Sequence, residues 1–158
     1  MASQTANAQF NVFLENDPVD YELVNANFEK LDKMALAIES GSKTASYSGV
    51  TTGNATWYYK KYTDGTVELY TKIGFDTMKC SGGSKAPYNS DTTKLYFPIT
   101  LTAIDDVQMH LASNTVGWVN DITGKGVTDC VQFKVMSMES ESDYVYKQVT
   151  INIKGRWK

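Results

Sequence analysis

The sequence predicts a mainly β protein, in which an N-terminal α-helix that forms a short trimeric coiled coil precedes an antiparallel β-sandwich knob. Before Gly41, apolar residues recur at the spacing of three and four that is typical of a helix, and after Gly41 short segments alternate apolar and polar residues as strands do. The apolar share of 42% and the charged share of 21% are those of a globular protein with a real core. We therefore divide the chain into 1–41, an arm and oligomerisation helix, and 42–158, the β knob.

The composition argues against several classes of protein. A net charge of −3 does not suit nucleic acid, because neutralising phosphates needs a basic surface. No apolar run approaches the roughly 18 residues of a membrane span, and the first ten residues lack the basic and apolar regions of a secretory signal. We expect the protein to stay in the cytoplasm, or to leave the cell by lysis or within a larger particle.

Cysteine and histidine provide no metal-ligand spacing. Cys80 and Cys130 are expected to be free thiols, because two cysteines without a signal peptide rarely pair. His110 is the only histidine, and the chain has no Cys-x-x-Cys motif. The sequence therefore predicts neither a metal nor a cofactor.

Residues 1–16 are expected to form an extended polar arm with a few apolar side chains that need cover. Two interpretations stay open: these side chains fold back onto the helix as a staple, or they dock onto another protein and attach the chain to it. The apolar residues of the arm are Phe10, Val12, Phe13 and Leu14.

The helix is expected to begin near Asp17 and Pro18, which suit the cap and the first helical position, and to end at Ser40–Gly41. One seam of this helix carries a heptad-like stripe, and β-branched residues at its d positions favour three strands over two. The predicted trimerisation residues are Tyr21, Val24, Phe28, Leu31, Ala35 and Ile38. The alternative is an amphipathic helix that packs on its own β domain.

The rest of the chain reads as seven or eight short strands, which favours an antiparallel sandwich or a closed barrel. Asp64–Gly65 is a hairpin turn, and Val67, Leu69, Thr71 and Ile73 after it alternate with polar residues. Alternation also predicts strands over 95–101, where Pro98 marks an edge or a bulge, over 131–135 and over 145–153.

The sequence contains no recognisable catalytic set. A hydrolase or transferase needs a nucleophile, a base and a group that orients the base. His110 stands in a strand without an acidic or thiol companion, and the acidic residues Glu139, Glu141 and Asp143 are expected in a solvated turn. We therefore predict that the protein is not an enzyme.

Ten tyrosines and three tryptophans make binding the more promising class, because exposed aromatic side chains stack on sugars and on protein partners. The structural alternative is that these aromatic residues simply pack within strands. The candidate contact loops are 81–91, 113–126 and 138–144. The receptor-binding candidates in them are Tyr88, Asn89, Asp91, Trp118, Asn120, Asp121 and Tyr144.

The stretch from Trp57 to Tyr70, which contains Lys60-Lys61 and Asp64-Gly65, resembles the first hairpin in the C-terminal domains of bacteriophage tail-fibre proteins. Leu95-Tyr96-Phe97-Pro98-Ile99 is similar to their Phe-Pro strand, and Val149 to Trp157 resembles their last strand. The segment 24–32 is similar to helices at the start of small phage appendage proteins.

This resemblance implies a homotrimeric virion protein, a tail fibre or baseplate appendage. Its arm would bind other virion proteins, and its β knob would bind a bacterial surface saccharide or protein. The chain lacks both a long shaft and the clustered histidines of some metal-binding fibre tips. The alternatives are a virion component without a receptor, such as a head fibre, decoration or collar protein, and a monomeric lectin-like module.

Overall fold

The computed structural model of the chain describes residues 3–4, 11–12, 21–33, 36–76, 78–141 and 145–158. The chain forms two compact units, Met1–Leu36 and Ala37–Lys158, and the prediction of a mainly β protein is confirmed. No helix in the described ranges has both the length and the apolar character needed to cross a membrane.

The N-terminal unit holds a short antiparallel ladder between β1 (Ser3–Gln4) and β2 (Asn11–Val12), followed by the helix α1 (Tyr21–Lys33). The predicted helix end at Ser40–Gly41 is wrong. The strand β3 already begins at Ala37, so Ile38, Ser40 and Gly41 belong to a strand. Pairing explains the difference, because β3 forms a ladder with β4 from Ala37 onward and Glu39 forms an ion pair with Lys61 across it, at 2.9 Å.

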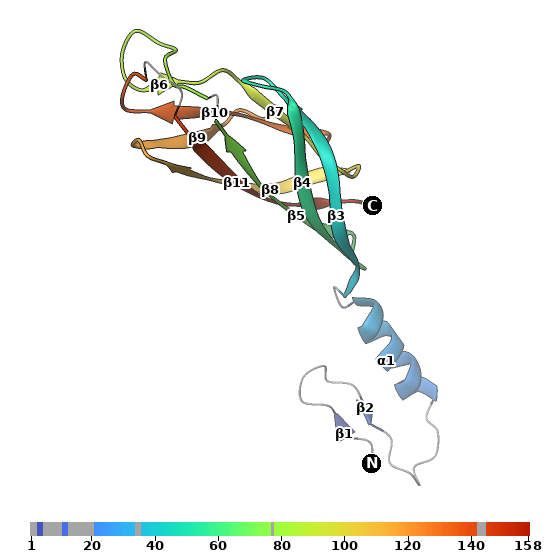
Figure 1. The fold of residues 1–158 in the computed structure, drawn as a ribbon. Helices are drawn as coiled ribbons and strands as arrows, with labels where there is room; N and C mark the ends of the chain where they lie inside the picture. Colours follow the sequence, from blue (N-terminus) through green and yellow to red (C-terminus); the bar gives the residue numbers. More distant parts are fainter. Residues whose placement is uncertain (1–2, 5–10, 13–20, 34–35, 77, 142–144) are drawn as a thin grey trace. The chain divides into compact units, whose positions relative to one another are not determined.

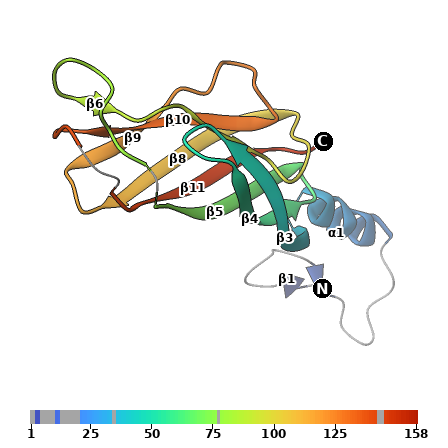
Figure 2. The ribbon, with the colours of Figure 1, turned by 45° about the horizontal axis from the view of Figure 1, so that its top comes forward.

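The second unit is one antiparallel sheet of nine strands, shown in Figure 1 and turned in Figure 2. Its hydrogen-bonded order is β6-β10-β7-β3-β4-β5-β11-β8, and β9 pairs with β10 outside this path. The strands are β3 (Ala37–Ser48), β4 (Gly53–Tyr62), β5 (Thr66–Phe75), β6 (Tyr88–Asn89), β7 (Thr93–Tyr96), β8 (Ala103–Ser113), β9 (Gly117–Asp121), β10 (Cys130–Ser137) and β11 (Lys147–Arg156).

The sheet curls on itself instead of forming the predicted sandwich of two separate sheets. The short strand β7 pairs with β3 on one side and with β10 on the other, and so joins what would be two sheets into one. β8, at one end of this order, contacts β9, which pairs with β10 near the other end. The curl encloses a core against which both ends of the sheet pack.

The core consists of the inward side chains of these strands, as their alternation predicts. In β5, Val67, Leu69, Thr71 and Ile73 are buried, and the inward residues of β10 and β11 are buried likewise. Trp57 is fully buried, lies edge-on to Phe97 at 5.8 Å between ring centroids, and donates its indole N–H to the Tyr96 carbonyl at 3.0 Å. A buried indole with its polar atom satisfied is a stable centre for such a core.

The turn between β4 and β5 has the predicted Asp64–Gly65 chemistry. Gly65 has φ +85°, and its N–H donates to the Tyr62 carbonyl at 3.1 Å. The Asp64 carboxylate accepts from the Thr66 N–H at 2.8 Å and from its hydroxyl at 2.9 Å, and these hydrogen bonds lower the pKa of Asp64. The hairpin prediction is confirmed.

The predicted strand over 95–101 is too long. β7 ends at Tyr96, and Phe97–Leu101 lie outside any strand. The physical reason is Pro98, which has no N–H to donate to a ladder. Phe97 still packs against the core, and its own N–H donates to the Asp129 carbonyl at 2.9 Å.

Candidate functional site

Two of the predicted contact segments meet on the two sides of one strand. β6 pairs with one edge of β10 and β9 pairs with the other, and Met136 of β10 lies opposite both Asn89 and Trp118. Residues directly opposite one another in antiparallel strands project from the same face. We call the resulting surface the β10 face; its members are Asn89, Asn120, Lys134, Met136 and Trp118.

The β10 face combines an exposed aromatic ring with polar groups. Trp118 is 43% exposed, and Asn120 lies opposite Lys134 in the ladder. The Lys134 ammonium donates to the Asn89 amide oxygen at 3.4 Å. Val116 and Met138, joined by a hydrogen bond of 3.0 Å between the Met138 N–H and the Val116 carbonyl, add exposed apolar area beside it. Such a surface can stack on a ligand and hydrogen-bond to it at once.

The loop before β7 is fastened to β10, which holds Asn89 in place. Gly82 and Asn89 exchange two backbone hydrogen bonds of 3.0 Å, and the Asn89 amide nitrogen donates to the Gly82 carbonyl at 3.2 Å. The buried hydroxyl of Ser90 accepts the Val135 N–H at 3.0 Å, and the Ser90 N–H donates to the Val135 carbonyl at 2.9 Å. These hydrogen bonds therefore hold this part of the contact loop in a defined conformation.

The remaining receptor candidates lie elsewhere. Tyr88 is half-buried and packs against the core, and Asp91 is exposed beyond β6. The Asp121 carboxylate accepts the Thr123 N–H at 2.8 Å and so holds the chain as it leaves β9. Tyr144 lies outside the described residues.

The third contact loop holds a buried ion pair that the sequence reasoning missed. Glu141, which was expected in a solvated turn, is 6% exposed and accepts from the Lys147 ammonium at 2.7 Å, the Cys80 N–H at 2.6 Å and the Thr115 hydroxyl at 3.0 Å. Burial alone would raise the pKa of Glu141, but these hydrogen bonds outweigh it and hold the pKa below its ordinary value. The sequence does carry a sign of this pair. Lys147 stands two and four residues before Val149 and Ile151, so its side chain points to the same, inward face of β11.

The same pair affects a neighbouring thiol. Cys80 is buried and donates its S–H to the Val135 carbonyl at 3.3 Å. Burial, and after it the charge of Glu141, raise the pKa of Cys80 to about 11. Cys80 and Cys130 are both free and buried. The described residues contain no group of three or more His, Cys, Asp or Glu residues that could hold a metal ion.

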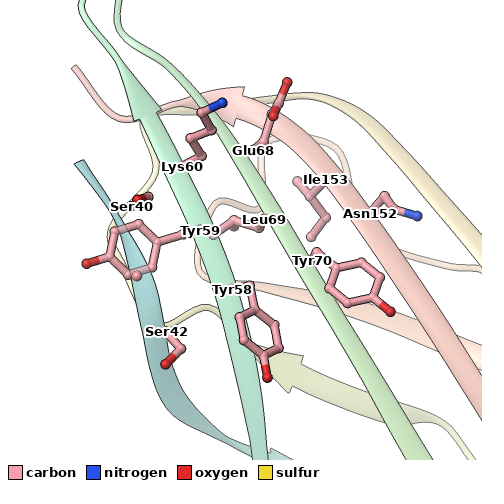
Figure 3. Close-up of a pocket in the computed structure, with 11 residues that line it drawn as sticks. Ser40, Ser42, Tyr58, Tyr59, Lys60, Glu68, Leu69, Tyr70, Asn152 and Ile153 are labelled. Carbon is pink, nitrogen blue, oxygen red and sulfur yellow. The ribbon is translucent and has the colours of Figure 1, made fainter. Parts of the chain in front are cut away.

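The outer side of β3, β4, β5 and β11 carries a hollow that is separate from the β10 face, and Figure 3 shows it in close-up. Its volume is about 660 Å³. Ser42, Tyr58, Tyr70 and Asn152 form one row across its four strands, with the two tyrosine rings in the middle. The alternation that buries Trp57 points Tyr58 outward, so the sequence carried a signal for this surface.

The structure places the predicted trimerisation residues on different elements. Tyr21, Val24, Phe28 and Leu31 lie in α1, and Ile38 lies in β3. Phe28 is 62% exposed and Ile38 is 54% exposed. Val12 lies in β2, while Ala35 and the attachment candidates Phe10, Phe13 and Leu14 lie outside the described residues.

Comparison with known proteins does not assign the chain to a family. No protein-family model matches the sequence, and no curated protein matches it. Among solved structures, the chain is similar to the P. aeruginosa R1 pyocin fiber, in a structure comprising C-terminal residues 323–701, with a TM-score of 0.49 and 10% identity. The match covers 87% of this chain, which spans 32% of that fragment. At this identity and this TM-score the likeness is one of partial shape, and it assigns no function to the chain.

Proposed function

We propose that the chain is a structural protein of a bacteriophage virion, a homotrimeric tail fibre or baseplate appendage whose β unit binds the host cell surface. In this proposal the protein acts by binding and without catalysis. The N-terminal unit supplies association and attachment to other virion proteins, and the finished protein resides in the virion. The tail-fibre resemblance of the hairpin from Trp57 to Tyr70 supports this assignment.

The observation that carries the receptor proposal is the convergence of two contact segments, distant in sequence, on the β10 face. In both views β6 and β9 lie at the end of the β unit opposite to the end where β3 begins (Figures 1 and 2). The chain enters the β unit at the start of β3, and the β10 face lies at the other end of this unit. Trp118 with its polar neighbours is then the natural contact for a host receptor.

Exposure of the helix seam supports self-association. Phe28 lies at an a position of the predicted heptad and is 62% exposed in the single chain. Burying a phenylalanine side chain contributes about 1.5–3 kcal/mol, and three copies around one axis would each gain it. A helix of 13 residues is marginal on its own, so such packing would also stabilise the helix.

The association is tested by measuring the mass of the full chain in solution by light scattering. We expect a trimer for the unmodified protein and a lower mass for Phe28→Gln, which removes the apolar contact but keeps a good helix former. Glu29→Gln, one position away and exposed, is the control and should stay trimeric. A monomeric unmodified chain would contradict the trimer.

The receptor function is tested by binding of the fluorescently labelled full chain to a panel of intact bacterial strains. Trp118→Thr, which keeps a strand-forming residue, should abolish binding to the strains that the unmodified chain labels. Tyr146→Thr, an exposed aromatic outside the β10 face, should not. If Trp118→Thr binds as before, the β10 face is not the receptor site; if no strain binds, a virion component without a receptor is the better assignment.

A further inference from the structure

Tyr58 and Tyr70 form an exposed aromatic pair on the outer side of the sheet, away from the β10 face. Their rings lie 6.2 Å apart between centroids with an interplanar angle of 39°, and the side chains are 56% and 39% exposed. Figure 3 shows them next to each other on β4 and β5. No structural need explains two exposed rings here, because the inward neighbours Trp57, Tyr59, Leu69 and Thr71 already fill the core side.

Hollows lie on both sides of this pair. The first, of about 660 Å³, reaches from the rings to Ser40, Lys60 and Glu68. The second, of about 550 Å³, is lined by Thr56, Lys72 and the same two tyrosines. A ligand that fills both hollows has to pass over the rings, so the surface suits an extended chain and not a compact small molecule.

Polar side chains flank the rings along the same row. Ser42 lies opposite Tyr58 on one side, and Asn152 lies opposite Tyr70 on the other. In the part of the chain that the structure describes, the side chains of Ser42, Asn152 and both tyrosines have no hydrogen-bonding partner of their own. A hydroxyl, an amide and two phenols beside aromatic faces match the surface of a sugar, which presents C–H groups on its ring faces and hydroxyls at its edge.

The charge around the pair is positive although the chain as a whole is acidic. Three outward lysines, Lys60, Lys72 and Lys154, stand against two carboxylates, Glu68 and Asp106. Glu68 lies opposite Lys60 and Lys154, and Asp106 lies opposite Lys154, so Lys72 is the lysine that lacks a facing carboxylate. The Glu68 carboxylate already accepts the Tyr62 hydroxyl at 2.8 Å. Lys72 has no ion-pair partner among the described residues. In a protein of net charge −3 this local excess of cations favours an anionic ligand.

We propose that this tyrosine face, defined by Ser42, Tyr58, Lys60, Tyr70, Lys72 and Asn152, binds a segment of an acidic polysaccharide. Sugar rings stack on Tyr58 and Tyr70, and the carboxylate or phosphate groups of neighbouring units pair with Lys60 in one hollow and Lys72 in the other. The inference concerns a second surface and stands whether or not the β10 face binds a receptor.

The test measures binding of the full chain to immobilised polygalacturonate, hyaluronate, alginate and a glycerol-phosphate polymer, with neutral dextran as the matched uncharged probe. We expect binding to at least one acidic polymer, weak or no binding to dextran, and weaker binding as salt is raised from about 0.05 M to about 0.5 M. The carboxylate and phosphate polymers distinguish the two sources of negative charge. Binding to none of the acidic polymers, or equal binding to dextran, would overturn the proposal.

Variants tie the binding to the face. The double variant Tyr58→Thr/Tyr70→Thr keeps strand propensity and should weaken binding about tenfold or more. Lys72→Gln should weaken it and flatten its salt dependence, whereas Lys125→Gln, the same change on an exposed loop, should not.

Thermal unfolding of each variant provides the check on folding. Unchanged binding by a folded tyrosine double variant would overturn the proposal. Equal losses of polymer binding in Lys72→Gln and Lys125→Gln would also overturn the proposal, because they would mean that the acidic polymers are attracted to any basic side chain.

Discussion

The Glu141–Lys147 pair is where single side chains matter most to the β unit. Both groups are buried, at 2.7 Å from each other, and Glu141 also fastens the Cys80 N–H and the Thr115 hydroxyl. One carboxylate thus holds three segments that are distant in sequence. Breaking a buried pair by removing one partner is costly, because the other charge is left buried without compensation.

We therefore predict that Lys147→Met lowers the free energy of unfolding by about 3–5 kcal/mol. The double variant Glu141→Gln/Lys147→Met should recover part of the loss, because it removes both charges. Urea unfolding followed by circular dichroism measures both changes. A double variant no more stable than the single one would show that the pair is not coupled in this way.

The same carboxylate gives the fold a dependence on acid pH. The pKa of Glu141 is lower in the folded chain than its ordinary value of 4.5, so the unfolded chain binds more protons in this range and stability falls as the pH falls. Above about pH 4.5 the contribution is complete. Glu141→Gln should start from lower stability and decline less steeply below that pH in urea titrations, whereas Glu139→Gln, an exposed change in the same turn, should keep the original slope.

At the scale of elements, the alternation of apolar and polar residues predicted the strands. It predicted neither where the helix ends nor the order in which the strands pair. The alternation in β5, β10 and β11 is a local property, and burial reproduces it. Ser40–Gly41 has the chemistry of a helix stop, but pairing of β3 with β4 overrides that local signal. The candidate site divides in the same way: Trp118 and Asn89 were recognised by composition, but only strand order brings them together on β10.

The turn between β3 and β4 offers a prediction at this scale. Gly49 has φ +125°, and a Cβ there would lie 2.0 Å from the Thr92 carbonyl oxygen. Gly49→Ala should therefore cost more than about 3 kcal/mol, because it adds a backbone clash to a strained conformation. Gly126→Ala is the control: its φ is +81° and nothing lies within 4 Å of the added atom, so it should cost only about 1 kcal/mol. Equal losses in thermal unfolding would contradict the clash.

For the whole molecule, the chain divides between Leu36 and Ala37 into two compact units, to which we assign different tasks. The β unit encloses its own hydrophobic core, whereas α1 exposes the side chain of Phe28. The physical expectation is that the β unit is stable without association and that the N-terminal unit is stable only with it.

We predict that a chain starting at Ala37 is a folded monomer whose melting temperature does not change with protein concentration. The full chain should melt at a temperature that rises with concentration, because association stabilises the folded state by mass action. Differential scanning calorimetry over a hundredfold range of concentration, with light scattering at each end, measures both. Starting at Ala37 keeps all of β3 and the Glu39–Lys61 ion pair, so a loss of trimer cannot be ascribed to a damaged sheet. If the shortened chain stays trimeric, association belongs to the β unit, and the exposed strand β3 becomes the surface on which to look for it.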